Sequence, residues 1–111
     1  MDDKVRKYLF DIQVSIDSIY EYIGEKRDFF EYQTNKLLRR GVERELEIIG
    51  EALNRILKLD ENIKISSSKR IVGLRNFIIH NYDKVDDTII WGIISKDLLL
   101  LKSEVKLLMK E

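Results

Sequence analysis

The sequence has 111 residues, enough for one hydrophobic core but not for two, so residues 1–111 are expected to form a single domain. It contains no cysteine and one histidine, which excludes disulfides and thiolate chemistry and argues against any metal site. Twenty basic and twenty acidic residues give a formal net charge of zero. That balance argues against sequence-blind binding to nucleic acid through a broad basic surface.

The N-terminal segment MDDKVRKYLF is charged and lacks the apolar region of a secretory signal. The longest apolar runs, such as LLLL at 98–101, are far shorter than the roughly 20 residues that cross a bilayer. A cytoplasmic protein without membrane spans is therefore expected.

Apolar residues recur at three- and four-residue steps along most of the chain, which is typical of helices, and proline is absent. The first apolar stripe predicts a helix over residues 3–23, with Gly24 as its C-terminal stop. The aromatic stretch RDFFEYQTN predicts one short helical turn, and a second long helix is expected over residues 35–59. Gly41 and Gly50 lie inside that helix and weaken it by about 1 kcal/mol each, unless close packing requires the space.

The loop DENIKISSS ends in serines suited to capping a third helix, expected from Ser68 to His80. Asp86 or Asp87 can cap the last helical segment, which extends to residue 109. A bend is expected near residues 95–97, because Asp97 could start a separate helix. Four main helices with short connections predict an all-α, antiparallel four-helix-type bundle with a short extra helical turn.

Basic residues cluster in NKLLRRGVER, which contains Lys36, Arg39, Arg40 and Arg44, and again in SSSKR. Such clusters are either solvated helix surface or a local contact for RNA. The pattern leaves both interpretations open.

The only histidine lies in GLRNFIIHNY, residues 73–82, between Arg75 and Tyr82. On an ideal helix Arg75 and Tyr82 share a face, whereas Arg75 and His80 are roughly 140° apart around the axis. A shared site therefore requires one of three things. The helix ends or widens at His80, the long Arg75 side chain sweeps round, or a second copy of the chain completes the site.

These residue types suit metal-free cleavage of RNA, in which the ribose 2′-hydroxyl is the nucleophile. Histidine can remove or donate a proton near neutral pH, and arginine can stabilise charge on a pentavalent phosphorus. A two-fold dimer would supply two histidines to one cleft. Alternatively, His80 only hydrogen-bonds the last carbonyls of its helix, and Tyr82 is an interface aromatic.

Glu47 and Glu51 lie one helical turn apart in the second long helix. They could orient Arg75 or His80 within the site. They could equally pair with Arg44 and Arg55 on the surface, and the sequence does not decide between these roles.

The segment RNFIIHNY, residues 75–82, resembles the R-x-x-x-x-H-x-Y signature of the HEPN superfamily, specifically its HepT-like branch. The segment ERELEIIGEALNR, residues 43–55, is similar to the second-helix motif of that branch. VDDTIIWGII, residues 85–94, resembles the region after the signature. The likeness covers nearly the whole chain in matching order.

The resemblance implies a HEPN bundle that forms a homodimer with both signatures in one cleft. It implies a metal-independent endoribonuclease without cofactor, the toxin of a toxin–antitoxin pair. Arg75 would stabilise charge, His80 would serve as acid and base, and Asn76 would position the site. The partner would be a minimal nucleotidyltransferase that uses ATP and Mg²⁺ to attach AMP to Tyr82.

Members of the branch commonly carry prolines and a tryptophan before the signature helix, where this chain has KISSSKR. They also tend to have a proline near residues 98–99, and this chain has none there. Two other functions fit the pattern: a non-catalytic HEPN subunit that binds a nucleotidyltransferase or a nucleotide, and a plain helical dimerisation module.

Overall fold

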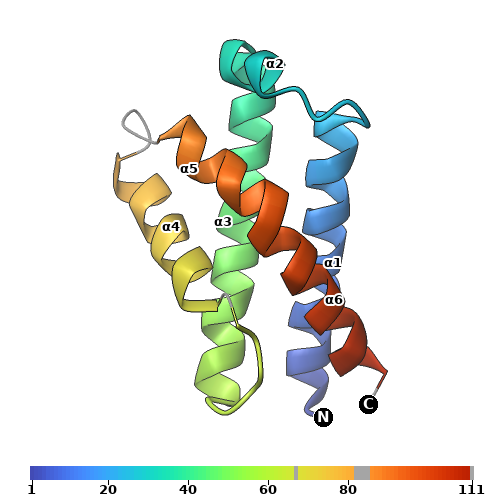
Figure 1. Cartoon of the computed structure of the whole chain (residues 1–111). Helices are drawn as coiled ribbons and strands as arrows, with labels where there is room; N and C mark the ends of the chain where they lie inside the picture. The colour runs from blue at the N-terminus through green and yellow to red at the C-terminus, as the bar shows by residue number, and fades with distance from the viewer. Residues whose placement is uncertain (67, 82–85, 111) are drawn as a thin grey trace.

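The computed structural model describes residues 1–66, 68–81 and 86–110, and for residues 77 and 79–81 it describes the backbone alone. Within these ranges all regular structure is helical, and the main helices pack antiparallel to their chain neighbours (Figure 1). Both termini lie at the same end of the bundle, where Arg6 donates a hydrogen bond to the carbonyl of Met109 at 3.3 Å. The all-α bundle predicted from the sequence is confirmed.

The first half of the chain forms three helices with side-chain caps at their N-termini. Helix α1 spans Asp3–Ile23, α2 spans Phe29–Thr34 and α3 spans Lys36–Leu59. Asp2, Asp28 and Asn35 each accept a hydrogen bond from a backbone N–H of the first turn, which satisfies donors that the helix itself cannot. Gly24 ends α1 at a positive φ of 79°, as the sequence predicts.

The second half contains α4, Ser68–Asn81, which packs on α3, and then a long segment that crosses the bundle (Figure 1). That segment consists of α5, Asp87–Gly92, a π-helical turn η2, Ile93–Asp97, and α6, Leu98–Met109. Asp86 caps α5 by accepting from the Thr88 N–H at 2.8 Å. The serine at position 67, a candidate cap for α4, lies outside the described residues.

The sequence predicts a change near residues 95–97 with Asp97 starting a separate helix, and α6 does begin directly after Asp97. The helix does change near residues 95–97, but it widens into a π turn, and Asp97 has helical backbone angles and makes no capping hydrogen bond. Its carboxylate is buried and forms an ion pair with Arg70 at 3.1 Å. A charge partner on α4 therefore explains this aspartate better than a helix start.

The core contains the apolar stripes of all the long helices. Most of the apolar residues that recur at three- and four-residue steps along the predicted helices are buried. Leu38, Leu74 and Leu108 are only partly buried. The rings of Phe29 and Trp91 pack at a tilt of 57° with centroids 5.6 Å apart, and Trp91 also contacts the buried ring of Tyr32. This aromatic cluster fastens the short helix α2 to α5.

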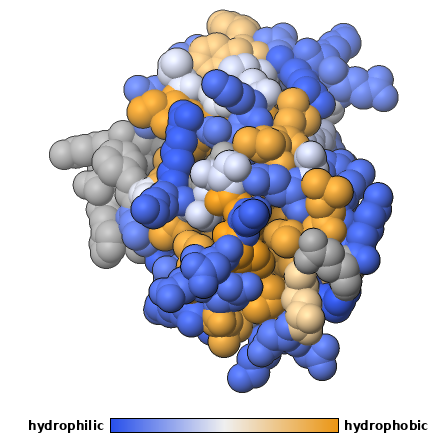
Figure 2. Space-filling model, turned by 60° about the horizontal axis from the view of Figure 1, so that its bottom comes forward, coloured by the Kyte–Doolittle hydropathy of each residue, from blue (hydrophilic) through white to orange (hydrophobic). Residues whose placement is uncertain are grey.

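At the end of the bundle where the termini lie, apolar side chains emerge between hydrophilic ones (Figure 2). Met1, Leu59 and Leu107 are among the exposed apolar residues there, around a groove that Val5 and Ile63 also line. Among the described residues, no helix combines the length and the apolar character that a bilayer crossing requires.

Candidate active site

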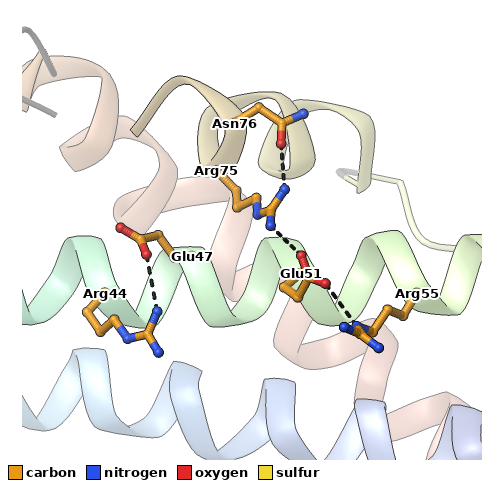
Figure 3. A network of polar contacts seen from close by, with 6 residues as sticks. All are labelled: Arg44, Glu47, Glu51, Arg55, Arg75 and Asn76. Atoms are coloured by element: carbon orange, nitrogen blue, oxygen red, sulfur yellow. Dashed lines mark hydrogen bonds and ion pairs between the residues drawn. The ribbon is translucent and has the colours of Figure 1, made fainter. Parts of the chain in front are cut away.

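Arg75 lies on the side of α4 that packs against α3, and its side chain is 24% exposed. Its guanidinium forms an ion pair with the Glu51 carboxylate of α3 and donates through Nη1 to Asn76 Oδ1 at 2.7 Å (Figure 3). Nε of Arg75 is buried and has no hydrogen-bond partner among the described residues. The guanidinium is thus fixed from two sides and retains an unused donor.

Glu51 connects Arg75 with a second arginine. Its other carboxylate oxygen accepts from Arg55 Nε at 2.9 Å (Figure 3). The hydrogen bond from Arg55 and the charge of Arg75 lower the pKa of Glu51, so the carboxylate remains ionised. Glu51 therefore fills both roles left open by the sequence, since it holds Arg75 and also pairs with Arg55.

Glu47 differs from Glu51 although it lies one turn earlier on the same helix. Its carboxylate accepts from Arg44 Nη1 at 3.2 Å, and the described contacts do not connect it to Arg75. The described contacts thus place Glu47 in an ion pair with Arg44, whereas the alternative of a contact with the His80 side chain lies outside the described residues.

Gly50 allows α4 to approach α3 at Arg75. A Cβ atom at position 50 would lie 2.3 Å from Cβ and 2.7 Å from Cγ of Arg75, and 3.3 Å from the carbonyl oxygen of Ile71. Real Cβ atoms essentially never approach closer than 3.0 Å, so the contacts with Arg75 mean that any other residue would push the helices apart. The sequence suggested that close packing could justify a glycine here, but it did not connect Gly50 with Arg75.

The backbone of His80 lies in α4, which remains α-helical through Asn81. The helix thus continues one residue beyond the predicted end at His80, and of the three alternatives for a shared site an end or widening at His80 itself is not observed. The His80 side chain and all of Tyr82 lie outside what the structure describes, so their roles remain predictions. Asn76 is exposed and its side-chain oxygen binds Arg75, as a positioning role requires.

A groove of about 240 Å³ runs between α1 and α3 and is bordered by Arg75. Most of the residues that line it have polar side chains, namely Tyr8, Asp11, Arg44, Glu47, Glu51 and Arg55, together with Ile48 and Ala52. Where side chains are described, no three acidic or histidine residues are grouped as metal ligands would be. The groove instead presents guanidinium groups, which suit phosphate oxygens.

An all-helical bundle that carries an arginine and, five residues later, a histidine on one helix has the architecture of the HEPN proteins. The model of the family described as "Ribonuclease HepT-like" matches residues 12–108. The chain belongs to this family.

Several curated proteins are similar over most of the chain. The protein named putative RNase MJ1380 from Methanocaldococcus jannaschii is 37% identical over 105 residues, covering 93% of this chain and 94% of the relative. Putative RNase MJ0125 of the same organism is 30% identical over 96% of this chain and 92% of its own length. A third, named gamma-glutamylcyclotransferase and putative RNase MJ0434, is 35% identical over the whole of this chain, which spans half of that relative. No solved structure gives a significant match.

Proposed function

We propose that this chain is a metal-independent endoribonuclease that acts in the cytoplasm as the toxin of a toxin–antitoxin pair. The observation that carries the proposal is the fixed guanidinium of Arg75, held by Glu51 and Asn76 beside a groove. A planar guanidinium in a set position matches two phosphate oxygens and can stabilise the charge that builds on them. Membership of the HepT-like ribonuclease family and relatives named putative RNases support RNA as the substrate.

In the proposed reaction the 2′-oxygen of a ribose attacks the adjacent phosphorus and the bond to the 5′-oxygen breaks. One histidine removes the 2′-hydroxyl proton and a second group protonates the leaving 5′-oxygen. Arg75 stabilises the pentavalent phosphorane between these steps. The products are a 2′,3′-cyclic phosphate and a 5′-hydroxyl, so atoms and protons balance without a metal.

The chain has one histidine, and we propose that a homodimer supplies the other. An uninterrupted α-helix separates positions 75 and 80 by about 140° around its axis, which argues for completion of the cleft by a second copy. The dimer would bring two arginines and two histidines together across α4.

A growth assay tests the proposal directly. Expression of the wild type alone is expected to arrest growth. Cells that express Arg75→Ala or His80→Ala should grow, and the helix content of both variants should equal that of the wild type. The purified wild type should cleave RNA, and cleavage should persist in EDTA. Growth arrest by His80→Ala equal to that of the wild type would contradict the catalytic role, and loss of cleavage with EDTA would contradict the metal-free mechanism.

The proposal includes neutralisation by a minimal nucleotidyltransferase that transfers AMP from ATP, with Mg²⁺, to the Tyr82 hydroxyl. The tyrosine oxygen attacks the α-phosphorus, pyrophosphate leaves, and the new phosphodiester adds a negative charge two residues beyond His80. Intact mass and peptide mapping after co-expression should find AMP on Tyr82, and Tyr82→Phe should remain toxic with the partner present. Adducts at another residue would refute this step.

A further inference from the structure

Arg44 and Arg55 lie on the same face of α3 as the carboxylates that hold them, at spacings of three and four residues. Eleven residues separate the two arginines, which corresponds to about 16 Å along the helix. Arg75 reaches α3 from α4 between them, at Glu51 (Figure 3). Three guanidinium groups thus follow one another along a single groove.

The two outer arginines are far more accessible than Arg75. Their side chains are 69% and 55% exposed for Arg44 and Arg55, against 24% for Arg75. Arg44 binds Glu47 through Nη1, and Arg55 binds Glu51 through Nε. Each arginine is therefore oriented by a carboxylate, and Arg55 also has a side-chain hydrogen bond with Tyr8, while much of each side chain stays exposed to solvent.

Carboxylates offset the charge of the groove as a whole. The groove is lined by three arginines and by three carboxylates, Asp11, Glu47 and Glu51, so their formal charges cancel. Asp11 also forms an ion pair with Lys7 at 2.5 Å. A groove of zero net charge does not attract polyanions over a long range. It can still bind a strand whose phosphates meet the oriented guanidinium groups one by one.

We propose that the groove between α1 and α3 binds the single strand of RNA that flanks the cleaved bond, with Arg44 and Arg55 contacting phosphates on opposite sides of the one bound by Arg75. This inference rests on the proposed ribonuclease function and extends it to the substrate class, a single strand several nucleotides long. Tyr8 lines the same groove, where its side chain is hydrogen-bonded with Arg55 and its ring is partly packed against the core.

Binding is measured first, in the His80→Ala background so that the probe stays intact. A fluorescein-labelled single-stranded RNA octanucleotide is titrated by anisotropy at several salt concentrations. Arg44→Gln and Arg55→Gln are each expected to raise Kd about three- to tenfold. Each should also reduce the slope of log Kd against log salt by about 0.7, the contribution of one phosphate contact on a single strand.

Arg39→Gln is the matched control, because it removes the same charge from a partly exposed arginine of α3 that does not line the groove. It should leave Kd and the salt slope unchanged. In the active background, the kcat/KM of Arg55→Gln should fall more for an octanucleotide than for a dinucleotide, which cannot reach the outer arginines.

Equal Kd and equal salt slope for Arg44→Gln, Arg55→Gln and their parent would overturn the inference. A loss of RNA affinity in Arg39→Gln as large as that in Arg44→Gln and Arg55→Gln would also overturn the inference. A wild type that binds the octanucleotide through these arginines but cleaves no RNA would refute the proposed ribonuclease and leave the groove assignment standing. Equal RNA cleavage by the wild type and by a variant that lacks both Arg44 and Arg55 would refute the groove assignment and leave the proposed ribonuclease standing.

Discussion

At the scale of single residues, Arg75 shows how a candidate catalytic side chain is held before any substrate binds. Two of its nitrogens are occupied, by Glu51 and Asn76, and Nε is buried without a partner among the described residues. A long flexible side chain loses rotamer freedom when it is fixed, and that cost is already met in the folded protein. The carboxylate of Glu51 is thus a positioning group for the arginine.

Glu51→Gln tests this positioning role. The amide keeps the size of the side chain but removes the charge that holds Arg75, so the guanidinium should become mobile. We expect kcat for RNA cleavage to fall about tenfold with KM nearly unchanged, a loss of roughly 1.4 kcal/mol of transition-state stabilisation. Steady-state kinetics with Glu51→Asp as a partial rescue provide the measurement.

Glu45→Gln is the control for that experiment, because Glu45 lies on α3 and accepts a hydrogen bond from Tyr22 at 2.9 Å instead of contacting Arg75. It should retain wild-type kcat. A rise in KM alone for Glu51→Gln would show that Glu51 acts through substrate binding and not through Arg75.

At the scale of the elements, the contact between α3 and α4 decides where Arg75 lies. Hydrophobic periodicity predicted both helices and most of their buried stripes, because burial of one face is a local property of the sequence. The same periodicity could not show that Gly50 faces Arg75, since that contact joins residues 25 positions apart and depends on how the helices cross. The ion pair of Arg70 with Asp97 escaped prediction for the same reason.

Gly50→Ala should separate α3 from α4. The added Cβ would meet Arg75 Cβ at 2.3 Å, a distance that only a backbone shift relieves. Such overpacking costs about 1–3 kcal/mol, which for a domain of this size lowers the thermal midpoint by roughly 4–8 °C for each kcal/mol. Calorimetry measures the shift, and cleavage by the remaining folded protein should also fall because Arg75 is displaced.

Gly92→Ala is the matched substitution, because no atom lies within 4 Å of an added Cβ there and the backbone is helical. It should be neutral, or stabilising by up to about 1 kcal/mol through helix propensity. If Gly50→Ala proves as stable as Gly92→Ala, the close approach of α4 to α3 at Arg75 is wrong.

At the scale of the whole molecule, the described residues of one chain form a hydrophobic core, but the chain has only one histidine for the proposed reaction, which uses two proton-transfer groups. The single core and the helical architecture follow from composition and periodicity. The number of chains that form the cleft cannot be predicted from composition and periodicity. A helix that already has an apolar side toward its own core shows no separate sequence pattern for an interface with a second chain.

The protein is expected to sediment as a dimer at micromolar concentration, with α4 in the interface. Gly73 lies on the exposed side of α4, with no atom near the position of an added Cβ. Gly73→Lys should therefore leave the fold intact, convert the dimer to a monomer and abolish cleavage. Ser103→Lys, on the exposed side of α6, should remain dimeric and active. Sedimentation of the wild type as a monomer would exclude the shared cleft.

The π turn between α5 and α6 has a consequence for how the chain can change length. A π turn is equivalent to one extra residue in an α-helix, and it rotates all later side chains by about 100° around the axis. Ile90 and Ile93 before the turn and Leu101 and Val105 after it all face the core with that rotation in place. Deletion of one residue within 93–97 would let the segment close into a regular α-helix while α6 keeps its apolar face toward the core. The turn therefore accommodates one extra residue without changing the register of the C-terminal quarter of the chain.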